Sequence, residues 1–96
     1  MKTDIIRADM TRDEAGSYLG HTVFRLEGHE AAYEITLFSK KGKEWDYALN
    51  FAEESGDEEQ FLRADSLIEE DDELFDRLLD AALEMQEEST EDKSGQ

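Results

Sequence analysis

Apolar and polar residues alternate with a period of two between His21 and Ala52. This alternation is typical of half-buried β-strands, because successive side chains of a strand point to opposite faces of a sheet. Turn-forming residues divide the segment into three strands, at Gly28-His29 and at Lys40-Lys41-Gly42. Short connections of this kind join antiparallel neighbours. The pattern therefore predicts a three-stranded antiparallel meander with one apolar face.

The apolar face also determines how these strands pair, because a slip of one residue moves every side chain to the opposite face. A two-residue first turn pairs Phe24 with Tyr33. At the second turn, a three-residue loop with a left-handed Gly42 pairs Leu37 with Trp45, whereas a two-residue loop would expose the apolar set. We expect nine residues on the apolar face: Phe24, Leu26, Tyr33, Ile35, Leu37, Trp45, Tyr47, Leu49 and Phe51.

Helical patterns flank the predicted strands. Residues 11–14 match a capping box and predict a short helix that ends near Gly20. In the C-terminal half, apolar residues recur with helical spacing and predict a helix that covers the sheet. These apolar residues are Leu74, Phe75, Leu78, Leu79, Ala82 and Leu83.

The start of the C-terminal helix has two candidates. Ser66 begins a second capping box, whereas Asp71 would fall on the apolar stripe and favours a new start there or at Asp72. Residues 53–60 are expected to form a loop.

The expected fold class is α+β: a small two-layer α-β-β-β-α domain in which a three-stranded antiparallel meander is covered by a C-terminal amphipathic helix. A chain of 96 residues has room for one such domain. We assign residues 1–88 to it. Residues 89–96 contain nothing apolar, and we expect them to form a disordered acidic and polar tail.

Several classes of chemistry lack the residues they need. The chain has no cysteine, so it forms no disulfide, thiolate metal site or cysteine nucleophile. Neither His21 nor His29 has the spacing of a metal ligand or of a catalytic pair, and the glycines form no phosphate-binding motif. We expect no enzymatic activity, no metal and no cofactor. Without a signal peptide or a transmembrane segment, we expect a cytoplasmic protein.

Charge is distributed unevenly along the chain, whose formal net charge is −17. Residues 1–52 contain nine acidic and seven basic side chains, whereas residues 53–96 contain 18 acidic and three basic ones. A strongly negative protein repels phosphate backbones and anionic lipids, so we expect no direct binding to nucleic acid or to a membrane. The expected partner is the basic surface of another protein.

Carboxylates form a row along the predicted C-terminal helix. The row consists of Asp72, Asp76, Asp80, Glu84 and Glu88, with Glu69, Glu73 and Glu87 beside it. Four residues advance a helix by about 6 Å, so the spacing is roughly that of phosphates. Like charges at this spacing destabilise a helix by about 0.2–0.5 kcal/mol per pair. Their presence favours docking on a basic protein surface, in its extreme form as a nucleic-acid mimic or inhibitor.

One further interpretation competes with this one. The carboxylates can be only a solvated face that favours solubility. The protein would then work through its sheet, as an interaction or homodimerising domain, using an open strand edge or the exposed residues Val23, Phe38 and Ala48. We expect a monomer or a weak homodimer.

Overall fold

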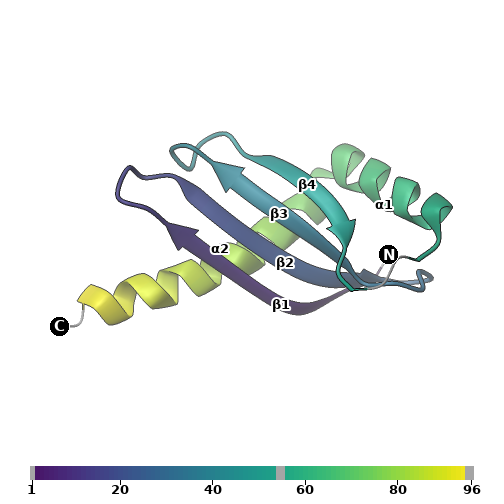
Figure 1. Ribbon diagram of the computed structural model, residues 1–96, viewed down its shortest axis with the longest axis horizontal. Helices are drawn as coiled ribbons and strands as arrows, with labels where there is room; N and C mark the ends of the chain where they lie inside the picture. Colours follow the sequence, from purple (N-terminus) through teal and green to yellow (C-terminus); the bar gives the residue numbers. More distant parts are fainter. Residues whose placement is uncertain (1, 54–55, 95–96) are drawn as a thin grey trace.

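Four antiparallel strands form one sheet in the order β1-β2-β3-β4, and two helices cover one face of it (Figure 1). The computed structural model describes residues 2–53 and 56–94, with side chains as far as residue 85. The elements are β1 (Thr3–Arg12), β2 (Tyr18–Leu26), β3 (Tyr33–Ser39), β4 (Asp46–Phe51), α1 (Glu58–Glu70) and α2 (Asp72–Ser94). The α+β class is confirmed. The expected three strands and single covering helix are wrong, because the sheet has a fourth strand and two helices cover it.

The segment after Thr11 is a hairpin loop and not the predicted short helix. The N–H of Asp13 donates to the carbonyl of Ser17 at 3.0 Å, and the N–H of Ser17 donates to the Asp13 carboxylate at 2.9 Å. Gly16 takes a left-handed φ of 93°. These features are typical of a three-residue hairpin loop that ends on a left-handed glycine. The helix prediction failed because a Thr-x-x-Glu spacing also fits a strand end that leads into such a loop.

A β-bulge in β1 decides which of its residues face the helices. Ile5 and Arg7 pair with consecutive residues of β2, so Ile6 is an extra residue between them. The extra residue reverses the alternation of faces along the strand. Ile5 therefore faces the helices before the bulge, and Met10, only 4% exposed, faces them after it. Without the bulge, Arg7 would point into the core.

The pairing of β2 with β3 is the predicted one, but the register of β3 with β4 differs by two residues. Leu37 lies opposite Tyr47 and not opposite Trp45, because the connecting loop spans residues 40–45 and is longer than predicted. Gly42 in this loop has the expected left-handed φ, at 80°. A shift by two residues leaves every side chain on its predicted face, since the side-chain period of a strand is two.

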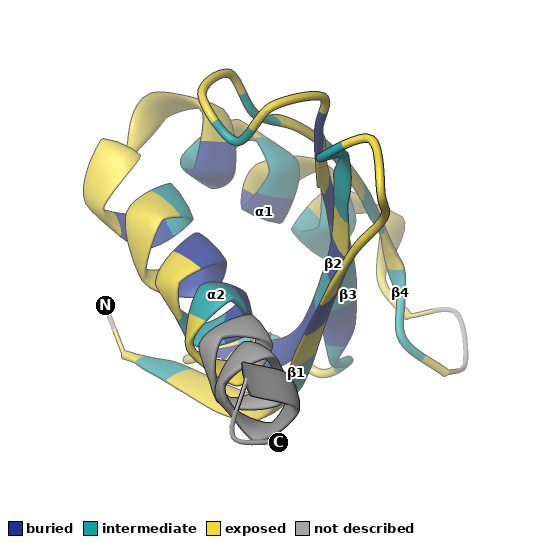
Figure 2. Ribbon diagram, turned by 90° about the vertical axis from the view of Figure 1, so that its left-hand side faces the viewer, coloured by how far each residue is buried: buried dark blue, intermediate teal, exposed yellow. Residues whose placement is uncertain are grey.

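The core lies between the sheet and the two helices (Figure 2). All nine residues predicted for the apolar sheet face belong to it, as do all six predicted apolar residues of the C-terminal helix. α2 packs on β1 and β2. α1 adds Phe61, whose ring centroid lies 5.0 Å from that of Phe51 in β4 and 6.1 Å from that of Tyr33 in β3. The two helices thus divide the sheet between them.

Asp71 separates the two helices, as its position on the apolar stripe predicted. Its carboxylate accepts hydrogen bonds from the N–H groups of Glu73 at 3.1 Å and Leu74 at 3.2 Å. It therefore caps α2, which begins at Asp72. The alternative start at Ser66 is wrong, because Ser66 lies inside α1.

The helix α1 begins within the segment 53–60 that was expected to be a loop. Asp57 caps it by accepting from the N–H groups of Glu59 and Gln60. Residues 53–60 contain no apolar side chain, so no helical periodicity indicates the start of α1 before Phe61.

Side chains beyond residue 85 lie outside the described part of the structure. α2 runs to Ser94, and the domain boundary after residue 88 and the disordered tail 89–96 stay predictions. In the part of the chain that is described, no helix combines the length and the apolar character that crossing a membrane requires.

Candidate functional site

The predicted carboxylate row lies on the exposed side of α2. Leu78 and Ala82, on the opposite side of the helix, have no exposed surface. Four members of the row have described side chains, and all are exposed: Asp72, Asp76, Asp80 and Glu84. They follow one another at intervals of four residues, or about one helical turn. The folded core therefore orients these carboxylates toward solvent as one continuous row.

The remaining predicted residues are distributed differently. Glu73 is exposed beside the row on α2. Glu69 is also exposed, but it belongs to α1 and lies before the break at Asp71, so it is not part of the same helical row. The side chain of Glu88 lies outside the described residues. Six of the seven predicted residues thus belong to α2, and the five with described side chains are all exposed.

The row is strongly negative. Between residues 72 and 85, α2 carries five acidic side chains and one basic side chain, Arg77. Within residues 2–53 and 56–85, the single ion-pair contact joins His21 to Asp9 on the sheet, far from this helix in sequence. In that part of the chain the carboxylates of the row form no ion pair, and Arg77 is the one basic side chain near them on α2.

A shallow groove runs between α2 and the start of β1, next to the row. It consists of two adjoining depressions, of about 530 Å³ and about 390 Å³, which share Thr3 and Arg77. Leu67, Asp71, Glu73 and Leu74 complete the lining of the first, and Ile5, Asp80, Ala81 and Glu84 complete that of the second. Asp80 and Glu84 therefore belong both to the row and to the groove.

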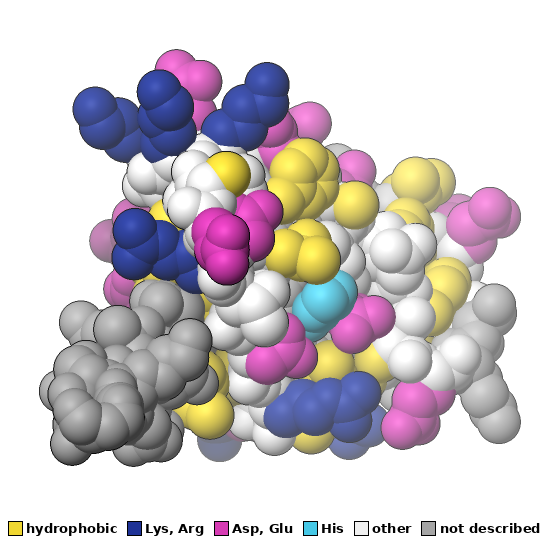
Figure 3. Space-filling model, turned by 60° about the vertical axis from the view of Figure 1, so that its left-hand side comes forward, with side chains coloured by type: hydrophobic (Ala, Val, Ile, Leu, Met, Phe, Trp, Pro, Cys, Tyr) yellow, Lys and Arg dark blue, Asp and Glu magenta, His cyan; other side chains and the backbone are white. Residues whose placement is uncertain are grey.

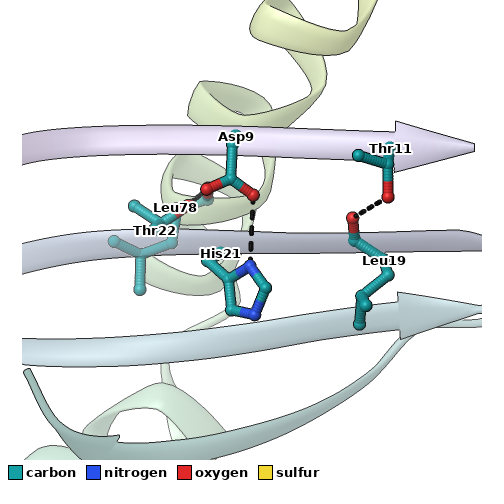
Figure 4. Close-up of polar contacts among 6 residues, drawn as sticks. All are labelled: Asp9, Thr11, Leu19, His21, Thr22 and Leu78. Atoms are coloured by element: carbon teal, nitrogen blue, oxygen red, sulfur yellow. Dashed lines mark hydrogen bonds and ion pairs between the residues drawn. The ribbon is translucent and has the colours of Figure 1, made fainter.

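On the other face of the sheet, Asp9 and His21 lie directly opposite each other in β1 and β2 (Figure 4). His21 Nδ1 is 3.1 Å from Oδ1 of Asp9, and it carries the proton of this contact because a carboxylate only accepts. The second ring nitrogen points away from Asp9 (Figure 4). The side chains are 35% and 62% exposed. In the described part of the chain, no hydroxyl nucleophile is hydrogen-bonded to this pair.

Next to this pair, the outer face of the sheet exposes a hydrophobic cross-strand pair. Leu19 in β2 lies opposite Phe38 in β3, and they are 47% and 40% exposed. Figure 3 shows that hydrophobic side chains on this side of the molecule lie among acidic and basic ones. Val23, predicted to be exposed here with Phe38, is only 5% exposed because long side chains flank it on both neighbouring strands, Arg7 and Glu34. Ala48 is exposed as expected.

Sequence reasoning missed both the Asp9–His21 contact and the exposure of Leu19. The contact requires β1, and the exposure of Leu19 requires β2 to begin at Tyr18, whereas the sequence predicted a short helix that ends near Gly20. The alternation of Ile6, Ala8 and Met10 was a usable signal, together with the turn residues that follow at 13–17. Ile5 and Ile6, adjacent at the bulge, interrupt the alternation and obscure that signal.

Tyr47 links the sheet to α1. Its hydroxyl donates to a carboxylate oxygen of Asp65 at 3.2 Å, and its ring packs against Phe75 of α2 with centroids 5.8 Å apart. Burial raises the pKa of the Tyr47 hydroxyl to about 12, and the negative charge of Asp65 acts in the same direction. This arrangement is a structural link between three elements.

In the described residues, no three histidine or acidic side chains come together in a way that could hold a metal ion. No family model, curated protein or solved structure matches this chain.

Proposed function

We propose that the protein is a small non-enzymatic binding module that docks on a basic surface of another protein through the carboxylate row of α2. The single observation that carries this proposal is the segregation of charge. The exposed side of α2 presents acids with one Arg77 among them, whereas the strands contain four acidic and three basic residues. A general solubilising coat would cover both parts of the molecule.

The energetics of the helix also support a binding role. Each pair of like charges four residues apart destabilises a helix by about 0.2–0.5 kcal/mol, so the three successive steps from Asp72 to Glu84 cost on the order of 1 kcal/mol. Lys or Arg at alternate positions would convert that repulsion into attraction. A partner with complementary charge recovers this energy in the complex and accelerates association through electrostatic steering.

The finer form of the proposal is a nucleic-acid mimic. Carboxylates about 6 Å apart along a rigid rod match the spacing of phosphates well enough to occupy a groove built for a nucleic-acid backbone. In this form the partner is a nucleic-acid-binding protein, and the complex inhibits it.

Capture of partners from a native lysate at two ionic strengths tests the proposal. The immobilised protein should retain basic proteins at about 50 mM salt and release most of them at about 500 mM, because salt screens contacts between exposed charges. Duplex DNA added at low salt should release the partner if the mimic form is right, and should leave it bound if the partner's basic surface has another role.

Two variants with equal loss of charge make the test specific. The first neutralises the row with Asp72→Asn, Asp76→Asn, Asp80→Asn and Glu84→Gln. The control neutralises four exposed acids elsewhere, with Asp4→Asn, Glu44→Gln, Asp46→Asn and Glu53→Gln. Capture should be lost with the first variant and kept with the control. Equal capture by both variants would refute the proposal.

The exposed pair Leu19 and Phe38 favours a second candidate function, association through the outer face of the sheet. Apolar contacts of this kind depend little on ionic strength, so salt separates the two candidates. Sedimentation of the protein at high concentration tests self-association, and Leu19→Ser with Phe38→Ser should abolish any dimer found. A dimer that survives both substitutions would place the contact elsewhere.

A further inference from the structure

The lining of the groove beside α2 includes apolar side chains from three elements. Leu67 of α1 and Leu74 of α2 line one end, and Ile5 of β1 and Ala81 of α2 line the other. Ile5 is 37% exposed, although it faces the helices. An exposed isoleucine is unremarkable by itself, but here it lines a depression between β1 and α2.

The rim of the same groove is acidic. Asp71 and Glu73 lie at the first depression and Asp80 and Glu84 at the second, with Arg77 common to both. The acids outnumber this one base by four to one. The groove therefore offers apolar contact at its floor and negative charge at its edges.

We infer that this groove binds a cationic amphipathic segment of the partner protein, with apolar side chains against Ile5 and Ala81 and Lys or Arg side chains against Asp80 and Glu84. This inference rests on the proposed function and deepens it, because it gives the basic partner an apolar component and a place to bind. The carboxylate row supplies attraction at long range, and the groove supplies contact at short range.

Charge complementarity selects this occupant over the others. A neutral apolar segment would remove water from the rim carboxylates without replacing it by a cation, which is unfavourable. A second copy of the chain would bring two molecules of net charge −17 together. A segment with apolar residues on one side and cationic residues beside them contacts the apolar lining and pairs with the carboxylates. An amphipathic helix that binds in an acidic-edged groove does the same.

Two synthetic peptides of about 18 residues distinguish the groove from the row. The first is an amphipathic helix built from Lys and Leu. The second has the same number of Lys, and Gln replaces every Leu. The intact protein should bind the first peptide at least about tenfold more tightly than the second at moderate salt, by fluorescence anisotropy, since only the first makes apolar contacts.

A substitution that fills the groove tests the location without changing charge. Ala81→Gln adds bulk at the lining and keeps good helix propensity, and Ser66→Gln places the same residue at an exposed position of α1 outside the groove. Ala81→Gln should reduce the affinity for the Lys-Leu peptide to nearly that of the Lys-Gln peptide. Ser66→Gln should leave both affinities as they are. Thermal melts of both variants establish that each is folded.

The carboxylates provide a matched pair of charge variants. Asp80→Asn with Glu84→Gln removes two acids that line the groove, and Asp72→Asn with Asp76→Asn removes two acids of the row that do not. For the Lys-Leu peptide, the first pair should weaken binding several-fold more than the second.

The outcomes separate the inference from the proposal on which it rests. Equal affinity for the two peptides, with no effect of Ala81→Gln, would overturn the inference that the groove binds the peptide. Salt-dependent binding of both peptides would still support the proposed role of the acidic row. Absence of binding by either peptide at low salt would overturn both. A preference for the Lys-Leu peptide that Ala81→Gln leaves unchanged would also overturn the inference, because the apolar contact would then lie elsewhere.

Discussion

The hydroxyl of Thr22, on the inner face of β2, donates a hydrogen bond to the main-chain carbonyl of Leu78 in α2 at 2.9 Å (Figure 4). Neither residue has exposed surface. A helix carbonyl has two lone pairs, so it can accept this bond in addition to the bond within the helix. The contact holds α2 against β2 at this point. It thereby helps to orient the carboxylate row on the exposed side of the helix.

Substitutions at Thr22 and at Leu78 should lower the free energy of unfolding by different amounts. Thr22→Val removes the hydroxyl, preserves the shape and leaves no buried donor unsatisfied, so it should cost about 1 kcal/mol or less. Leu78→Ala opens a cavity between helix and sheet and should cost about 2–5 kcal/mol. Urea unfolding measures both. A larger loss for Thr22→Val than for Leu78→Ala would contradict this packing of α2.

The pairing of β1 with β2 can be tested at Gly20. A Cβ atom there would lie 2.6 Å from Met10 Cε and 2.7 Å from the main-chain oxygen of Asp9. Gly20→Ala should therefore destabilise the protein by about 1–3 kcal/mol, because the main-chain oxygen cannot move aside without disturbing the ladder. Met10→Ala in the same chain should relieve one overlap, so the double variant should lose less than the two single losses added together. A Gly20→Ala protein as stable as the parent would argue against this pairing.

Stability at high pH should depend on Tyr47. Its pKa rises from 10.0 to about 12 in the folded protein because of burial and of the nearby Asp65 carboxylate. The folded state therefore retains the proton more strongly than the unfolded chain does. Its contribution to stability is complete below pH 10 and is lost as the pH rises toward about 12.

Tyr47→Phe should remove this dependence. Over the same pH interval, the free energy of unfolding should fall less steeply in the variant than in the parent, as measured by urea titrations at several pH values. Tyr33, whose pKa is also raised by burial, is present in both proteins and does not affect the difference. Identical slopes in the two proteins would show that Tyr47 ionises as readily in the folded protein as in the unfolded chain.

The parts of the fold that could be predicted from the sequence are those in which apolar residues recur with an uninterrupted strand or helix period. The apolar alternation from Phe24 to Phe51 identified the core face. The predicted faces were correct although the predicted loop was too short, because the register error was two residues, an even number. β1 could not be recognised in the same way. Its bulge at Ile6 breaks the alternation, and the turn residues after it also match a helix cap.

The candidate site shows a similar division. The carboxylate row follows from helical spacing alone, so the sequence predicted it. The groove requires Ile5 of β1 to lie beside Ala81 of α2, two residues far apart in the chain. No local pattern contains that information, because it arises from the packing of α2 against β1.

The central claim is that the carboxylate row of α2 is kept for binding although it destabilises the helix. Its most direct test measures unfolding and partner binding in the same two variants, in which Asp76, Asp80 and Glu84 are all replaced by Gln or all by Lys. Stability should stay level or rise by about 0.2–0.5 kcal/mol per relieved pair in the Gln variant. Binding to the natural partner at low salt should fall in both variants, and it should fall further with Lys because reversal adds repulsion to the lost attraction. A Lys variant that binds the partner as tightly as the parent does would contradict the claim.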